Sequence, residues 1–328
     1  MPNSSPEEVI ALNVLVWAQG ARHFTETLHA VPLPAGITLA VVETEEEALP
    51  HAPETDMLVT WGMNDIARFR QHAPRLRFVQ ALSSGVEGIL TPEFVASPLL
   101  LANARGANAP AIVEHALALI FALTRKIHVA VRNQEQHRWQ FGPAAGSEIA
   151  GQTLGVLGMG AIGRETARRA RLLGMKIAAV QRPGREPLPE VDQYVADTKA
   201  LCAVADFLLV AVPLTPENTN LVGAPELACM KPTAHLVNVA RGPVVDEAAL
   251  IAAIQEGRLA GAGLDVTAVE PLPPESPLWD LENVIITPHT GGASPHTMGR
   301  VLELTFENIR RLYEGAELLN LVDKQRGY

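Results

Sequence analysis

Arg241, Glu270 and His289 each stand close to the end of an apolar run of the sequence. Arg241 precedes Gly-Pro, and its guanidinium can hold a carboxylate or a carbonyl oxygen through parallel hydrogen bonds. His289 follows Pro288, and histidine is the side chain best suited to exchange a proton near neutral pH. A carboxylate beside it fixes its tautomer and favours the protonated form. A cation, an imidazole and a carboxylate together supply what the reduction of a carbonyl group requires.

Upstream of these residues, a glycine-rich turn joins a predicted strand, 153–158, to a predicted helix, 164–173. The first glycine of such a turn permits a tight bend, the second lets the backbone approach a pyrophosphate, and the third allows the helix to pack closely on the strand. Phosphates then lie at a helix N-terminus, which favours anions. The predicted dinucleotide loop is Gly158, Met159, Gly160, Ala161, Ile162 and Gly163.

Each polar residue alone also has a structural interpretation. An arginine before Gly-Pro is usually a surface residue in a turn, an acid among prolines is often solvated or caps a loop, and a lone histidine after a strand is more often structural. Their order along the chain, downstream of a dinucleotide loop, favours a site in which a bound cofactor supplies hydride. No metal-binding motif such as HExxH or CxxC occurs, so a catalytic metal is not indicated.

The residues after the strand predicted at 176–180 indicate which dinucleotide is used. A site for NAD usually places an acid there to accept a hydrogen bond from the ribose 2′-OH. Here Gln181, Arg182 and Arg185 follow the strand, and the first acid is Glu186. Arg182 can bind a 2′-phosphate, and Arg185 adds positive charge, although both can also be solvated loop residues. We therefore expect NADP(H) to be preferred over NAD(H).

Short apolar runs alternate with helical patterns along most of the chain, which predicts the α/β class. Several runs are apolar without alternation, as in parallel strands that helices cover on both faces. We therefore predict two doubly wound parallel sheets, with long helices at 108–133 and 298–314. The predicted strands are 12–17, 38–42, 57–60, 78–81, 153–158, 176–180, 207–212, 235–239, 262–266 and 284–287.

The composition is that of a globular protein: 328 residues, 48% hydrophobic and 19% charged, enough for two domains. The net charge of -10, without a basic block, disfavours nucleic acid as a partner. The apolar stretches are too short to span a bilayer, so no membrane association is expected. The start of the chain lacks the features of a signal peptide, and we expect a cytoplasmic protein in which Cys202 and Cys229 are buried thiols.

These segments resemble the signatures of the D-isomer-specific 2-hydroxyacid dehydrogenase family. The similarity covers nearly the whole chain, and its motifs are 103–106, 109–115, 158–163, 212–219 and the segments that hold Arg241, Glu270 and His289. The resemblance implies two Rossmann-like domains with a cleft between them. Residues 1–102 plus 291–328 would form the substrate-binding domain and 103–290 the dinucleotide-binding domain. The family usually dimerises through the cofactor domains, which implies a homodimer.

The resemblance also implies roles for individual residues. Arg241 would bind the substrate, Glu270 would pair with the acid/base His289, and Asp265 would hold the nicotinamide amide. The remaining residues implied to line the cofactor site are Val212, Pro213, Thr219, Val239, Ala240 and Gly291, together with Arg241 and His289. Those implied to bind the substrate carboxylate, or to lie close to it, are Ser84, Gly85, Val86, Trp61 and Gly62.

The implied activity is the reduction of a small 2-oxo acid, such as glyoxylate or hydroxypyruvate, to the D-2-hydroxy acid, with His289 as the proton donor. A different class stays open: a dinucleotide-sensing corepressor of the same fold, although such proteins carry long extensions that this chain is not expected to have. Formate oxidation is disfavoured, because formate-oxidising members carry Gln where this chain has Glu270. Phosphite oxidation remains a remote option.

Overall fold

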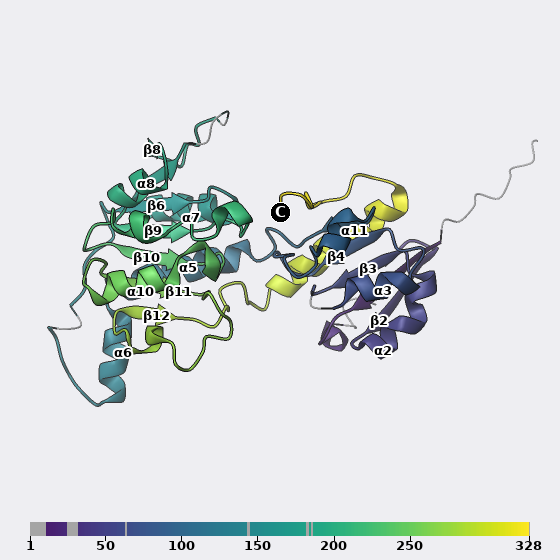
Figure 1. The fold of residues 1–328 in the computed structure, drawn as a ribbon, viewed down its shortest axis with the longest axis horizontal. Coiled ribbons are helices and arrows are strands. Elements are labelled where there is room, and N and C mark those ends of the chain that lie inside the picture. The colour runs from purple at the N-terminus through teal and green to yellow at the C-terminus, as the bar shows by residue number, and fades with distance from the viewer. Residues whose placement is uncertain are drawn as a thin grey trace, which may run out of the picture. The chain divides into compact units, whose positions relative to one another are not determined.

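The computed structural model describes residues 11–24, 32–62, 64–142, 145–181, 184 and 186–327 (Figure 1). Contacts divide this part of the chain into unit 1, which runs to Asn108 and resumes at Ser294, and unit 2, Ala109–Ala293. The division falls after Asn108 rather than after residue 102, because residues 103–108 are bonded within unit 1. It falls after Ala293 rather than after residue 290, because the Gly291 N–H donates to Asp265 in unit 2.

Unit 1 is built on a parallel sheet with the strand order β2-β1-β3-β4-β5. Successive side chains of a strand point to opposite faces. In β1, Leu12, Val14 and Val16 therefore enter one core, while Leu15 and Trp17 enter the other. The three-residue strand β5 was not predicted. The strands are β1 Leu12–Trp17, β2 Ile37–Val42, β3 Met57–Thr60, β4 Phe78–Ala81 and β5 Leu100–Ala102.

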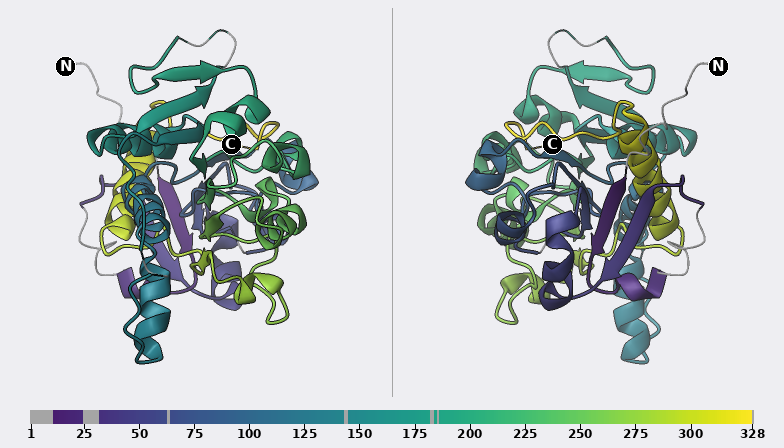
Figure 2. Two further views of the ribbon diagram at one scale, coloured as in Figure 1. Left: turned by 90° about the vertical axis from the view of Figure 1, so that its left-hand side faces the viewer. Right: turned by 90° about the vertical axis from the view of Figure 1, so that its right-hand side faces the viewer.

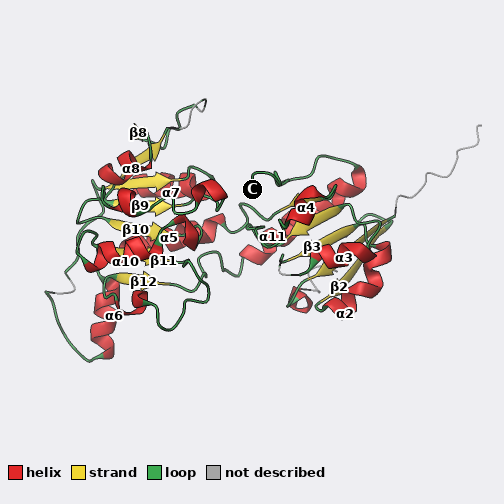
Figure 3. Ribbon diagram, viewed as in Figure 1, coloured by secondary structure: helices red, strands yellow, loops and turns green. Residues whose placement is uncertain are grey.

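Helices cover both faces of the unit 1 sheet (Figure 3). One core includes residues from α2 Glu45–Ala48, α3 Ile66–His72 and α4 Pro92–Ala96. The opposite core is closed by α11, Thr297–Glu314, whose Val301, Phe306 and Ile309 pack against strand residues. The helix α11, near the end of the chain, belongs to unit 1 together with the first strands.

Unit 2 contains a larger parallel sheet with the strand order β12-β11-β10-β9-β6-β7-β8 (Figure 1). One core draws on α5 Ala109–Thr124 and α7 Ala161–Leu172, and the other on α8 Thr198–Val204, α9 Ala224–Leu227 and α10 Glu247–Gln255. The three-residue β8 was not predicted. The strands are β6 Thr153–Leu157, β7 Lys176–Val180, β8 Gln193–Val195, β9 Phe207–Val210, β10 His235–Asn238, β11 Gly261–Leu264 and β12 Val284–Ile286.

The single helix predicted over 108–133 was wrong. The segment forms two helices, α5 and α6, the latter Ile127–Glu135. Lys126 separates them in the left-handed conformation, at φ 51°. In Figures 1 and 2, α6 projects away from the sheet of unit 2. None of its residues is buried, so the end of the predicted helix leaves the core instead of continuing across it.

The two cysteines differ in environment. Cys202 is buried, and burial raises the pKa of its thiol to about 12. Cys229 is exposed, which corrects the expectation of two buried thiols. Its position after the short helix α9 leaves its sulfur at the surface, where it donates to Pro225 O at 3.2 Å. Within the described ranges, no helix is long and apolar enough to cross a membrane.

His235, at the start of β10, should make the stability of unit 2 depend on pH. It stacks on Phe207 with ring centroids 5.2 Å apart, and burial, with nearby positive charge, lowers its pKa from 6.5 to about 4. The unfolded chain then binds a proton that the folded chain excludes, so stability falls as pH drops through this interval. We expect the free energy of unfolding to fall by about 2 kcal/mol between about pH 7 and pH 5 on this account.

Urea unfolding of the wild type and of His235→Phe at the two pH values measures this effect. Phe keeps the ring stack but cannot be protonated, so the loss of stability at the lower pH should shrink. The matched control is His72→Gln, because His72 is an exposed histidine of unit 1, away from β10. An unchanged pH dependence in His235→Phe would contradict the assignment.

Candidate active site

The predicted site residues of unit 2 follow the carboxyl ends of its strands. All pairings in this sheet are parallel, so these ends lie at one edge. The glycine loop follows β6, Val212 follows β9, Arg241 follows β10, Asp265 follows β11 and His289 follows β12. The chain order reverses between β6 and β9, and open α/β sheets bind ligands beside such a reversal.

The glycine loop has the geometry that its sequence predicts. Gly158 adopts φ 108°, and a Cβ on it would lie 2.5 Å from Ala211 O. A Cβ on Gly163 would lie 1.9 Å from Gly158 O, so only glycine lets α7 pack this closely on the turn. Gly160 differs, since a Cβ there would meet nothing within 4 Å. The backbone at Gly160 is therefore open to an approaching ligand.

The residues present fit a dinucleotide at this position. Gly160 is the N-cap of α7 and supplies no side-chain cap to the first N–H groups of the helix. These N–H groups and the helix dipole are suited to a pyrophosphate. The neighbouring Met159 and Ile162 are half-buried against the core, whereas Ala161 is exposed at the start of the helix.

The structure describes only part of the segment predicted to choose between the dinucleotides. Gln181 is exposed after β7, and its N–H donates to Val195 O at 2.9 Å. Arg182 and Arg185 lie outside the described residues. After β9, Val212 is buried, whereas Pro213 and Thr219 are exposed. The Thr219 hydroxyl donates to Thr215 O at 3.2 Å.

Glu270 and His289 form a direct pair. Glu270 Oε2 lies 2.7 Å from His289 Nδ1, and Glu270 Oε1 accepts from the Thr267 N–H at 3.1 Å. An ionised carboxylate only accepts hydrogen bonds, so His289 Nδ1 carries the proton and donates a hydrogen bond to Glu270. Nε2 is then the nitrogen that can exchange a proton with a ligand. The His289 side chain is 49% exposed, which leaves it accessible from the carboxyl edge of the sheet.

Arg241 is held by a turn that its neighbours shape. The buried Asn238 donates through Nδ2 to Arg241 O at 3.0 Å and accepts at Oδ1 from the Ala240 N–H at 3.0 Å. Arg241 Nη1 donates to Ala240 O at 2.8 Å. A Cβ on Gly242 would lie 1.8 Å from Thr267 O, so this glycine permits the turn to contact the segment that leads to Glu270.

Asp265 is a buried carboxylate with fixed donors. Oδ1 accepts from the Thr287 hydroxyl at 2.7 Å and from the Thr290 N–H at 3.0 Å, and Oδ2 accepts from the Gly291 N–H at 2.9 Å. Burial raises the pKa of Asp265, but bonds from His115, Thr287 and Gly291 outweigh it and hold the pKa below its usual value. Asp265 is therefore ionised at neutral pH and suited to accept from an amide.

His115 and Gly291 complete this cluster. His115 Nε2 lies 2.8 Å from Thr287 Oγ1 and 3.4 Å from Asp265 Oδ1. A Cβ on Gly291 would lie 2.6 Å from Asp265 Oδ2 and 3.1 Å from the His115 ring, so a side chain at this position would displace the carboxylate. Within the described ranges, no group of three or more His, Cys, Asp and Glu residues could hold a metal ion.

In unit 1, the predicted substrate residues lie on two loops that follow neighbouring strands. Trp61 and Gly62 follow β3, and Ser84, Gly85 and Val86 follow β4. Trp61 Nε1 donates to Gln19 O at 3.2 Å, and Gly62 adopts φ 85°. The Val86 side chain is buried, so its backbone is the part available to a ligand.

The second of these loops presents backbone donors. No acceptor for the N–H groups of Ser84, Gly85 and Val86 is found in the part of the chain that the structure describes. Consecutive N–H groups of this kind suit a carboxylate. The Ser84 hydroxyl donates to Ala104 O at 3.2 Å and to Asn108 Oδ1 at 3.1 Å, so it supports the loop.

Sequence reasoning missed the polar residues that support the site. Asn238 lies inside an apolar strand and gave no signal. His115 and Thr287 are 172 residues apart, so their contact follows from the fold alone. The available signal for His115 was a histidine inside a long apolar helical pattern, within the motif 109–115.

Comparison with known proteins places this site among relatives. A family model described as "D-isomer specific 2-hydroxyacid dehydrogenase, NAD binding domain" matches residues 117–291. A glyoxylate reductase of Korarchaeum cryptofilum is 37% identical over 278 residues, which cover 83% of this chain and 84% of that protein. A D-3-phosphoglycerate dehydrogenase of Synechocystis is 34% identical over 275 residues, and the match spans about half of its length.

Solved structures agree over nearly the whole chain. A D-isomer specific 2-hydroxyacid dehydrogenase family protein from Aeromonas salmonicida has a TM-score of 0.85 at 30% identity, over 95% of this chain and 99% of that one. An NADPH-dependent glyoxylate/hydroxypyruvate reductase from Sinorhizobium meliloti, in complex with NADP and malonate, has a TM-score of 0.80 at 28% identity, over 96% and 98%. The two-sheet fold predicted from the sequence is confirmed.

Proposed function

The chain belongs to the family of D-isomer-specific 2-hydroxyacid dehydrogenases, which are NAD(P)-dependent enzymes, and we propose that it reduces a small 2-oxo acid such as glyoxylate or hydroxypyruvate. The observation that carries this proposal is the 2.7 Å pair of Glu270 and His289 at the edge that also carries the glycine loop. The reductases among its relatives support the choice of substrate class.

In the proposed carbonyl reduction, each residue of the site has a separate role. In unit 2, Arg241 is suited to hold a carboxylate or a carbonyl oxygen of the substrate. In unit 1, the N–H groups of Ser84, Gly85 and Val86 are suited to a carboxylate. NAD(P)H, when bound at the glycine loop, would supply the hydride. His289 gives the Nε2 proton to the carbonyl oxygen as negative charge develops there, which completes the hydroxyl group of the product. Glu270 stabilises the imidazolium before transfer and keeps Nδ1 protonated afterwards.

Turnover of a panel of 2-oxo acids tests this proposal. The panel contains glyoxylate, hydroxypyruvate and pyruvate, each with NADPH and with NADH. We expect the highest kcat/KM with glyoxylate or hydroxypyruvate. No turnover of any acid by protein that binds a dinucleotide would contradict the proposal and favour a dinucleotide-sensing role.

NADP(H) is the proposed cofactor. Gln181 is neutral and exposed at the end of β7, where an acid would repel a 2′-phosphate. Relatives with NADPH or NADP in their solved structures support the same choice. Arg182 is proposed to bind the phosphate, with Arg185 adding to the positive field.

We expect wild-type enzyme to use NADPH with a higher kcat/KM than NADH. Arg182→Ala should lower the NADPH preference by about tenfold or more, the scale of one hydrogen bond to a charged group. The matched control is Arg258→Ala, because Arg258 is paired with Glu256 at the surface. Wild-type preference for NADH would refute the cofactor assignment, and an NADPH preference that survives Arg182→Ala would refute only the role of Arg182.

A homodimer through the cofactor domains is also proposed. Trp139 and Phe141 follow α6 and are 101% and 87% exposed, and α6 itself exposes Ile127 and Val131. Large apolar side chains exposed along one segment often mark an interface. A second copy of this chain is the occupant that the family resemblance implies.

We expect the wild type to sediment as a dimer at micromolar concentration, and the double variant Trp139→Ser, Phe141→Ser to dissociate at concentrations at least about tenfold higher than the wild type, since aromatic anchors carry much of an interface's affinity. Trp279→Ser is the control, because Trp279 is half-exposed on the 3-10 turn Pro277–Asp280, outside this segment. A monomeric wild type would contradict the proposal.

The enzyme is proposed to work in the cytoplasm. Both cysteines are free thiols, and free thiols persist in reducing compartments. Fractionation of the source cells, with the protein detected by antibody, tests this location.

A further inference from the structure

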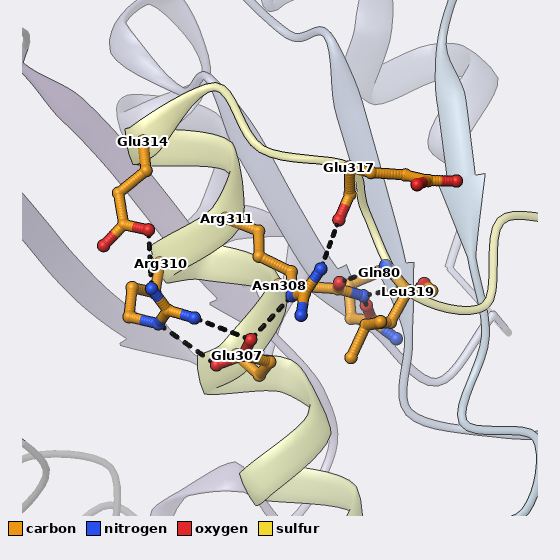
Figure 4. Close-up of polar contacts among 8 residues, drawn as sticks. All are labelled: Gln80, Glu307, Asn308, Arg310, Arg311, Glu314, Glu317 and Leu319. Carbon is orange, nitrogen blue, oxygen red and sulfur yellow. Dashed lines mark hydrogen bonds and ion pairs between the residues drawn. The ribbon is translucent and has the colours of Figure 1, made fainter.

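One buried amide ties the segment that follows α11 to β4 of the unit 1 sheet. Asn308 of α11 is fully buried. Its Nδ2 donates to Gln80 Oε1 at 2.7 Å and to Leu319 O at 3.1 Å, while its Oδ1 accepts from the Leu319 N–H at 2.7 Å (Figure 4). Gln80 lies on β4, so this amide joins the helix, the C-terminal segment and the strand that leads into the Ser84 loop.

The C-terminal segment then runs antiparallel to the edge strand of the sheet. Leu321 pairs with Ala102, the last residue of β5, and the Val322 N–H donates to Leu101 O at 2.8 Å. Val322 is buried. The segment therefore lies in a fixed register beside the end of β5, next to the residues that connect this strand to unit 2.

Asn320 forms hydrogen bonds to the turn that follows β5. It adopts φ 53°, a left-handed conformation that asparagine tolerates better than most residues. Its Nδ2 donates to Asn103 O at 3.2 Å and to Arg105 O at 2.8 Å, and its own carbonyl accepts from the Asn103 N–H at 3.2 Å. These bonds hold residues 103–105 from one side.

Asn103 connects the turn after β5 to the loop proposed to bind substrate, through hydrogen bonds to both. Its side chain is 3% exposed; Nδ2 donates to Ser84 O at 2.9 Å, and Oδ1 accepts from the Arg105 N–H at 3.2 Å. The adjacent Ala104 N–H donates to Ser83 O at 2.9 Å. Residues 103 and 104 thus hold two consecutive carbonyl groups of the loop.

Holding a carbonyl group also aims the next N–H group. A peptide unit is planar and trans, so its C=O and N–H point in opposite directions. The bond to Ser83 O fixes the Ser84 N–H, and the bond to Ser84 O fixes the Gly85 N–H. The Ser83 hydroxyl donates to Gly85 O at 2.6 Å and so fixes the Val86 N–H. All three N–H groups assigned to the substrate carboxylate are oriented in this way.

We propose that the C-terminal segment is a clamp, in which Asn320 and Asn103 are positioning residues that aim the N–H groups of Ser84 and Gly85 at the substrate carboxylate. This inference rests on the proposed function, which assigns the carboxylate to that loop. The clamp lies wholly within unit 1. It should therefore affect affinity for the oxo acid and leave affinity for the dinucleotide unchanged.

Two variants of Asn320 remove the clamp without straining the backbone. Glycine tolerates the left-handed conformation, so Asn320→Gly removes only the amide. Asn320→Asp keeps the shape but cannot donate to either carbonyl group. For both variants we expect KM for the oxo acid to rise about 3- to 10-fold, the scale of one net hydrogen bond, with kcat within about twofold and KM for NADPH unchanged. Asn103→Ala should raise KM for the oxo acid in the same way.

Lys324→Met is the matched control. Lys324 anchors the same segment through two carbonyl groups, Ser97 O at 2.6 Å and Leu99 O at 3.0 Å, but these lead to no part of the substrate loop. Its thermal unfolding midpoint should fall by an amount similar to that of Asn320→Gly, while its KM for the oxo acid stays at the wild-type value. A rise in KM for Lys324→Met equal to that of Asn320→Gly would overturn the clamp in favour of general destabilisation.

Binding of oxalate to the NADPH-bound protein separates failure of the clamp from failure of the proposed function. Oxalate carries the carboxylate but has no ketone or aldehyde carbonyl group to accept a hydride, so it binds without being reduced. Weaker oxalate binding in Asn320→Gly than in Lys324→Met supports the clamp even if no oxo acid is turned over. Equal oxalate binding in these variants, or no oxalate binding by the wild type, overturns it. Turnover by the wild type with an unchanged KM in Asn320→Gly overturns the clamp alone.

Discussion

His289→Ala should lower kcat by about 10²- to 10⁴-fold, the usual contribution of a general acid. The Nδ1 of His289 donates to Glu270 at 2.7 Å, so Nε2 is the proton donor in the proposed reaction, and alanine leaves no group that can replace it. The dinucleotide loop follows a different strand, β6, so the dissociation constant for NADPH should stay near the wild-type value. Steady-state turnover and fluorescence titration with NADPH measure the two quantities.

Two further variants make this experiment specific. Glu270→Gln removes the negative charge that stabilises the imidazolium and keeps the shape of the side chain, so kcat should fall while the dissociation constant for NADPH stays near the wild-type value. His296→Ala is the control, since His296 is an exposed histidine at the start of α11. Turnover close to wild type in a folded His289→Ala protein would contradict the assignment of the proton donor.

The elements predicted from the sequence are those whose pattern is long and buried. The apolar strands β1, β3, β6 and β7 begin and end within a residue of the predicted positions. The strands β5 and β8 have three residues each, too few to show a period, and are defined by their neighbours in the sheet. The break at Lys126 has no Gly or Pro to mark it, because the left-handed residue is a lysine.

The same distinction holds for the candidate site. Arg241, Asp265 and His289 could be predicted because a parallel sheet brings the carboxyl ends of its strands to one edge, and the pairing of His289 with Glu270 is now seen as a direct contact. The supporting residues could not be predicted. Asn238 fixes the Arg241 turn, and His115 reaches Thr287, through hydrogen bonds that exist only once distant segments have folded together.

Arg241→Lys should lower kcat/KM for the oxo acid by about 10²-fold, through a higher KM together with a lower kcat. Arginine presents a planar fork of donors that matches a carboxylate beside a carbonyl oxygen, whereas lysine places a single ammonium group on a flexible stem. Because lysine keeps the positive charge, the loss of kcat/KM measures the contribution of the planar arrangement of donors. The bond from Asn238 and the close approach of Gly242 to Thr267 O fix the backbone from which Arg241 extends. The turn therefore cannot move to restore the contacts that lysine fails to make.

The kinetic pattern separates substrate binding from a structural role for Arg241. If Arg241 binds both the ground state and the transition state, KM rises and kcat falls together, because the carboxylate is held less tightly and the carbonyl carbon is misplaced for hydride transfer. Arg258→Lys, a surface arginine paired with Glu256, should leave both constants unchanged. An unchanged KM in a folded Arg241→Lys protein would remove Arg241 from the substrate site and leave it a structural residue of the turn after β10.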